Sequence, residues 1–181
     1  MRKILDAIYL ASGALAGIFL FGICLVVLLQ VGANVIDAFI GLITGSPIGI
    51  LIPSYAEFAG FFLAASTFFA LAYSLRHGAH IRVNLLIRHF HNRSRVFIEI
   101  CCAVLGLTIS AYFTWFTIGL CLDSFKYGDV SVGIVPIPLW IPQMSMAGGL
   151  LILTIAFIDL FVALLRGSLP DFVIGNDKEG A

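Results

Sequence analysis

Four long apolar stretches constrain the fold of this chain more than any other feature of its sequence. A helix needs roughly 20 predominantly apolar residues to cross the hydrocarbon core of a bilayer. Four segments meet that requirement, at about residues 8–36, 54–75, 96–122 and 139–165. Apolar residues make up 61% of the 181-residue chain and charged residues only 11%, as is typical of membrane proteins. The sequence therefore predicts an all-α integral membrane protein, with residues 1–181 forming one membrane domain of four transmembrane helices.

The distribution of positive charge predicts the orientation of these helices. Lys and Arg concentrate in the short segments that stay in the cytoplasm. Two of them precede the first apolar stretch, five lie between Arg76 and Arg95, and two follow the fourth stretch, whereas the two remaining connections share only Lys126. We therefore expect both termini and the 76–95 segment on the cytoplasmic side, and residues 37–53 and 123–138 on the outer side.

The 76–95 segment also carries a helical pattern of its own. Val83, Leu86, Ile87 and Phe90 recur at the spacing of one helix face, and Arg82 and Arg88 belong to the polar remainder. At about residues 80–93 such a helix is too short to cross a bilayer, and its basic side suits the anionic inner surface, where it would contact membrane lipids. We expect a short interfacial amphipathic helix between the second and third spans; an unordered basic connection is the alternative.

All four histidines lie in the same segment, which raises the question of a metal or haem site. They are His77, His80, His89 and His91. No carboxylate or thiol in the segment completes a metal site, and no histidine lies within a predicted span, so we expect no metal and no cofactor. A membrane anchor or redox subunit that uses this cluster remains the alternative. The formal net charge is zero, which gives no electrostatic reason to expect nucleic acid as a partner.

Side chains at three of the predicted span ends suit the structure of a helix end or the membrane interface. Ser54-x-x-Glu57 has the spacing of a capping box at the start of the second span, and Glu57 could instead pair with a neighbouring subunit. Arg76 can extend toward the headgroups at the other end of that span. Pro138 and Pro142 fall where a helix tolerates proline, at the start of the fourth span, and Trp140 suits the membrane interface.

The middle of every span lacks Asp, Glu, Lys, Arg and His. All the carboxylates associated with the spans lie near their ends, whereas transporters and channels place charged or strongly polar residues at mid-membrane depth. We therefore expect neither an enzyme nor a self-sufficient transporter. The pattern favours a small helical subunit that packs against a larger protein.

One short motif indicates a family. The run GAHIRVNLL, from Gly78 to Leu86, resembles the G-x-H-I-R-V-D-L-L signature that follows the second helix in small permease subunits of tripartite ATP-independent periplasmic (TRAP) transporters. Glu57 and the IPLWIP run at 137–142 match the family as well. Asn84 departs from it, because the family usually has aspartate there. The residues assigned to this motif and its helix are Gly78, His80, Ile81, Arg82, Val83, Asn84, Leu86 and Arg88.

The resemblance implies a role in a three-part importer of the bacterial inner membrane. Its partners would be a large permease subunit, which holds the substrate and sodium sites and moves by an elevator motion, and a soluble periplasmic binding protein. An organic acid would be the substrate, and the small subunit would widen the stationary scaffold. Candidate contacts with the large subunit are Glu57, Arg76, Pro138, Trp140 and Pro142, and candidate contacts with the binding protein are Asp123, Lys126 and Asp129. A four-helix subunit of an unrelated assembly shares the same physical features.

Overall fold

The computed structural model describes residues 2–46, 48–49, 52–76 and 92–166 of the chain. Within these residues it contains the helices α1 (Arg2–Thr44), α2 (Tyr55–Arg76), α4 (Asn92–Tyr127) and α5 (Trp140–Leu165). All four are long and apolar enough to cross a membrane. The prediction of an all-helical chain with four candidate spans is confirmed, and the side on which the termini lie stays a prediction. The predicted interfacial helix lies outside the described residues, apart from Asn92 and Arg93, which begin α4.

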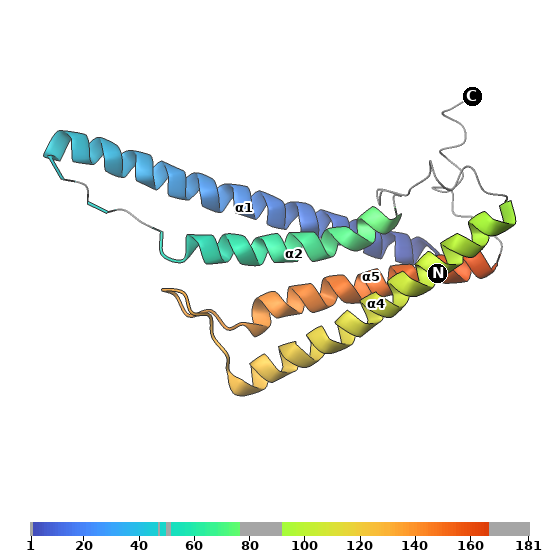
Figure 1. The fold of residues 1–181 in the computed structure, drawn as a ribbon. Helices are drawn as coiled ribbons and strands as arrows, with labels where there is room; N and C mark the ends of the chain where they lie inside the picture. The colour runs from blue at the N-terminus through green and yellow to red at the C-terminus, as the bar shows by residue number, and fades with distance from the viewer. Residues whose placement is uncertain (1, 47, 50–51, 77–91, 167–181) are drawn as a thin grey trace, which may run out of the picture.

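The helices pack as two pairs that meet along α2 and α5. α1 packs on α2, α4 packs on α5, and the contact between α2 and α5 joins the pairs, whereas α1 touches α5 only slightly. Figure 1 shows the resulting row, with α1 and α4 on its flanks. The buried core is a cluster of Tyr9, Ala72, Leu75, Leu150, Leu153 and Ala156, contributed by α1, α2 and α5.

Two of the helices are longer than the sequence predicts. α1 has 43 residues and α4 has 36, or about 64 Å and 54 Å at the usual helical rise. The connection expected to begin at Asp37 begins instead at Gly45, because residues 37–44 continue α1. Gly45 and Gly128 end these helices with φ values of +80° and +69°, a conformation that glycine adopts without strain.

Small residues allow the helices to approach closely. A Cβ placed on Gly149 of α5 would lie 2.6 Å from the carbonyl carbon of Phe68 in α2, and one on Gly106 of α4 would lie 2.5 Å from the Phe157 ring. In lipid, association depends on close packing and interhelical hydrogen bonds, because the hydrocarbon tails are as apolar as the side chains. The absence of a side chain at Gly149 is therefore what lets the backbones of α2 and α5 approach each other closely.

Hydroxyl groups supply the interhelical hydrogen bonds. Between α1 and α2, Ser12 Oγ donates to the Phe69 carbonyl at 2.5 Å and Ser66 Oγ donates to the Ala16 carbonyl at 2.9 Å. Between α4 and α5, the hydroxyls of Thr114 and Thr154 lie 3.0 Å apart. Such bonds contribute about 0.6 kcal/mol on average inside membranes, so they fix the register of each pair more than its strength.

The Gly149 contact predicts a difference between two glycine substitutions. Gly149→Ala should lower the free energy of unfolding by about 1–3 kcal/mol, the usual cost of overpacking a close contact. Gly60→Ala, in α2, is the matched control, because nothing lies within 4 Å of its added Cβ; it should be neutral or raise stability by up to about 1 kcal/mol. Thermal unfolding of both variants in the same detergent measures the difference. Equal melting temperatures would contradict the packing described for α2 and α5.

Candidate functional site

An ion-pair cluster ties three helices together at one end of the row. Arg76 Nη2 lies 3.1 Å from Asp6 Oδ1, and Arg76 Nη1 lies 4.0 Å from Asp159 Oδ2. All three side chains are partly exposed, so each pair stabilises the fold by at most about 1 kcal/mol. We call this end the ion-pair end. Arg76, a candidate subunit contact, is thus already engaged within its own chain.

At the opposite end, Glu57 lies beneath the connection between α4 and α5. This connection, residues 128–139, folds back on itself: Ser131 N–H donates to the Ile137 carbonyl and Leu139 N–H donates to the Asp129 carbonyl. We call this the hairpin end. Glu57 Oε2 is buried against Gly133, at a position where a Cβ on residue 133 would collide with it. It has no hydrogen-bond partner among the described residues.

The predicted capping box at Ser54 and Glu57 is wrong. Ser54 has φ +57°, whereas a capping residue normally has an extended backbone. Its carbonyl accepts the N–H groups of Glu57 and Phe58, while its hydroxyl accepts the Val135 N–H at 3.0 Å. The serine therefore joins the start of α2 to the 128–139 connection, a contact across the fold that local spacing could not indicate.

The other three candidate subunit contacts lie at the start of α5 and pack within the chain. Trp140 meets the ring of Phe125 edge to face, with 5.7 Å between centroids. Its carbonyl accepts a hydrogen bond from Cys121 Sγ at 3.6 Å. Pro138 pairs with Val130 in an isolated antiparallel bridge, and the Pro142 carbonyl accepts the Ser145 hydroxyl at 2.7 Å. All three are half-buried, so part of each surface remains open to a partner.

Asp123, Lys126 and Asp129 form an exposed charged group at the hairpin end. Asp123 and Lys126 lie in the last turns of α4 rather than in a connection. Lys126 Nζ lies 5.5 Å from the centroid of the Tyr127 ring, and Asp129 uses its backbone to hold the 128–139 connection. Among the described residues these three side chains form no ion pair, and they are accessible to a soluble partner.

Three polar side chains of α1, those of Gln30, Asn34 and Asp37, form a hydrogen-bonded group that the sequence analysis did not predict. We call this group the α1 clasp. Asp37 Oδ1 accepts the N–H groups of Ile48 and Gly49, both at 2.9 Å. Gln30, which is 3% exposed, accepts the Ile52 N–H at 3.1 Å and donates to Asn34 Oδ1 at 2.9 Å. Gln30, Asn34 and Asp37 stand at i, i+4 and i+7, so the spacing itself was a readable signal of one polar helix face. The α1 clasp therefore holds Ile48, Gly49 and Ile52, which follow the helix in the chain, against α1.

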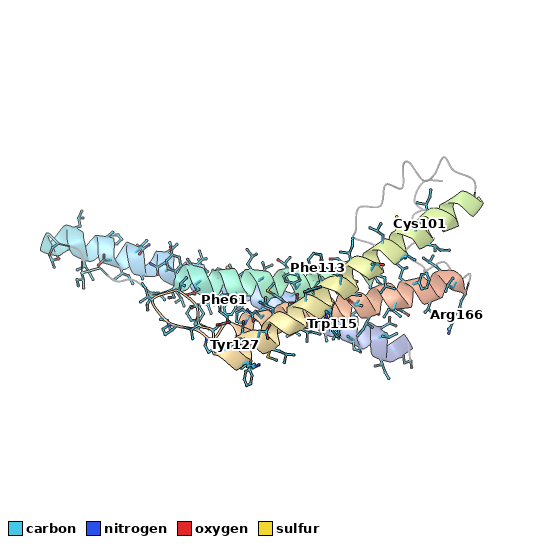
Figure 2. The ribbon with its side chains drawn as sticks, turned by 60° about the horizontal axis from the view of Figure 1, so that its bottom comes forward. Phe61, Cys101, Phe113, Trp115, Tyr127 and Arg166 are labelled. Atoms are coloured by element: carbon cyan, nitrogen blue, oxygen red, sulfur yellow. The ribbon has the colours of Figure 1, made fainter. Side chains whose placement is uncertain are left out.

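Most of the remaining surface of α1 and α4 is apolar and exposed. Each helix buries one narrow stripe, for example Ala103, Ser110, Thr114 and Ser124 on α4. The rest of the circumference of α4 carries large exposed aromatic residues, among them Phe113, Trp115 and Tyr127, which Figure 2 labels along the helix. Surfaces of this kind suit lipid or the helices of another membrane protein.

The family motif and the histidines cannot be placed in this geometry. Gly78 to Leu86, Arg88 and all four histidines lie outside the described residues. The interfacial helix and the alternative role of His77, His80, His89 and His91 therefore stay predictions.

Comparison with known proteins identifies the family. The family described as "Tripartite ATP-independent periplasmic transporters, DctQ component" matches residues 49–167, more than half of the chain. No curated protein and no solved structure matches the chain. The chain belongs to the DctQ family of TRAP transporter components, and the resemblance drawn from its motif is confirmed.

Family membership defines the general role. A DctQ component is part of a transporter rather than of an enzyme family, and it works with a large permease and a binding protein. Together with four apolar helices, this makes the chain a multi-pass protein of the inner membrane.

The clasp on α1 predicts a local effect of substituting Asp37. Asp37→Leu removes the acceptor for two backbone N–H groups, each worth about 1.5–3 kcal/mol when the acceptor is charged and less where water competes. Hydrogen exchange within residues 45–54 should become about tenfold faster, as mass spectrometry of the labelled protein would measure. Asp37→Asn keeps an acceptor oxygen, so its hydrogen-exchange rates should stay close to those of the unsubstituted chain. Unchanged exchange in Asp37→Leu would show that the clasp does not hold the segment.

Proposed function

We propose that this chain is the stationary accessory subunit of a sodium-coupled TRAP importer of an organic acid. It widens the membrane scaffold of the large permease, whose own helices bind the substrate and the sodium ions. Both termini lie in the cytoplasm, following the distribution of Lys and Arg, and the hairpin end faces the periplasm. The basic segment before α4 forms a helix on the inner surface that helps to fix the subunit in the plane of the bilayer.

The observation that carries this proposal is the polarity of the helices. No Asp, Glu, Lys, Arg or His lies between Asp6 and Asp37 in α1, between Glu57 and Arg76 in α2, between Glu99 and Asp123 in α4, or before Asp159 in α5. The hydroxyls in the middle of the helices bond to neighbouring helices or to their own backbone. A subunit of this kind offers packing surface, whereas a site for an anionic substrate needs charged or donor groups at that depth.

A scaffold role also has a clear mechanical meaning. An elevator-type transport domain crosses the bilayer against a partner that must not move with it. Four more helices enlarge the part of the transporter that is embedded in lipid, and so increase its resistance to displacement. The exposed charges of Asp123, Lys126 and Asp129 lie at the hairpin end, where the binding protein docks.

Reconstitution tests the accessory role. Proteoliposomes that contain this chain alone should show no uptake of substrate. Vesicles with both membrane subunits, supplied with the binding protein and a sodium gradient, should accumulate it. The two membrane subunits should also copurify from detergent. Uptake by the chain alone, or full uptake without it, would contradict the proposal.

If the binding protein docks at Asp123, Lys126 and Asp129, substitutions there should change its binding without changing the assembly of the two membrane subunits. Lys126→Glu and the double substitution Asp123→Lys with Asp129→Lys change the charge of this group in opposite directions, so they should shift the affinity of the binding protein about three- to tenfold in opposite directions, mainly through association rates that depend on salt. Copurification of the two membrane subunits should not change. Surface plasmon resonance on the assembled membrane complex measures the first quantity. Binding that is the same for all variants at low salt would place the docking surface elsewhere.

A further inference from the structure

The charged and aromatic ends of α2 and α5 define a common thickness. Glu57 and Arg76 delimit α2, and Trp140 and Asp159 delimit the same length of α5. Each pair is separated by about 28 Å along the helix axis, close to the roughly 30 Å of a hydrocarbon core. Arg76 and Asp159 meet at the ion-pair end, so the two helices are in step. The ends of α2 and α5 therefore serve as the levels of the two membrane surfaces, with which α1 can be compared.

α1 continues far past the surface at the hairpin end. Asp6 is level with Arg76 because their side chains are 3.1 Å apart, and Gly22 packs on Phe62, just over one turn of α2 from Glu57. Leu42 therefore lies about 20–25 Å beyond the level of Glu57 along the axis. Headgroups extend only about 5–8 Å beyond the hydrocarbon on each side, and a tilt of about 40° shortens the height by only about a quarter. Figure 1 shows α1 extending beyond the start of α2.

The part of α1 that lies beyond the lipid is apolar. Phe39, Leu42, Ile43 and Ile48 make up this patch, which we call the α1 tip; Leu42 and Ile43 are 86% and 82% exposed. The clasp of Asp37 on Ile48 and Gly49 gives the patch a fixed shape. Apolar surface in water costs about 25 cal/mol per Å², and a patch with no lipid to cover it marks a contact with another protein.

We infer that the large permease subunit covers the α1 tip in the assembled transporter. The exposed apolar face does not stop at the tip. It continues along α1 into the membrane through Val35, Leu28, Leu25, Phe21 and Ile18, which share one face at spacings of three, four and seven residues. A partner that flanks α1 both within the lipid and beyond it must itself span the membrane.

The charges favour the same partner over the binding protein. The α1 tip offers only apolar side chains, and its one neighbouring carboxylate, Asp37, is engaged by backbone N–H groups. The exposed charges at this end of the molecule lie elsewhere, at Asp123, Lys126 and Asp129. A soluble protein that docks and leaves suits the charged group, whereas a permanently apolar patch suits a permanent neighbour. The inference rests on the proposed function, because it assigns a surface to a partner of that assembly.

A photocrosslinking experiment in the complete complex tests the inference. The chain, with p-benzoylphenylalanine at position 42, is co-expressed with its large subunit, reconstituted in nanodiscs and irradiated with and without the binding protein. The expected product is a covalent adduct with the large subunit in both cases. An adduct with the binding protein, or none with the large subunit, would overturn the inference.

Two matched charge substitutions give a second readout. Leu42→Asp should reduce copurification of the large subunit about tenfold, while the amount of the chain in the membrane stays the same, because Leu42 supports no contact of the core. Val132→Asp is the control, since Val132 is also apolar and fully exposed at the hairpin end; it should not change copurification. Equal yields for the two variants would overturn the inference. If the unsubstituted subunits do not copurify at all, the proposed function fails; if they do and position 42 forms no adduct, only the assignment of the α1 tip fails.

Discussion

The close contact between α2 and α5 is the interaction on which the rest of the structure depends. Hydroxyl hydrogen bonds set the register within the α1–α2 and α4–α5 pairs, and the contact at Gly149 and Phe68 is where one pair meets the other. The same contact sets α2 and α5 in step, so that Arg76 reaches Asp159 at one end and Ser54 reaches the 128–139 connection at the other. The contact between Gly149 and Phe68 therefore positions both ends of the molecule.

Within this arrangement, many polar groups at the two ends have partners within the chain, although Glu57 Oε2 has none among the described residues, whereas much of the apolar surface stays exposed. Ion pairs, the α1 clasp and the 128–139 connection engage much of the charge and backbone polarity at the two ends. By contrast, α1 and α4 bury only one stripe each and expose large side chains elsewhere. Lipid can cover this surface at membrane depth, and we infer that the large permease subunit covers the part of α1 that extends beyond the start of α2. A small component of a larger transporter, the role defined by the DctQ family, accounts for both features.

The sequence predicted what depends on local composition. Long apolar runs fixed the number of spans, and the motif from Gly78 to Leu86 identified the family. The length of α1 was underestimated because Asp37 resembled the start of a polar connection, whereas its carboxylate serves N–H groups of the returning chain eleven and twelve residues later. The helix cap at Ser54 was predicted from local spacing alone, whereas its hydroxyl accepts the N–H of Val135, which lies in a distant part of the chain. Contacts of this kind depend on the packing of α2 on α5, which no local pattern reveals.

The central claim is that this chain is an incomplete membrane module whose exposed apolar surface is completed by a larger partner. Anything that binds only the folded state raises its apparent stability. The most direct measurement is the melting temperature of the purified chain, alone and in complex with the large permease subunit, in the same detergent at the same protein concentration. We predict that the α1–α2 and α4–α5 pairs unfold at a clearly higher temperature in the complex. An identical melting temperature in both samples would contradict the claim, because it would mean that the partner covers no surface that the fold depends on.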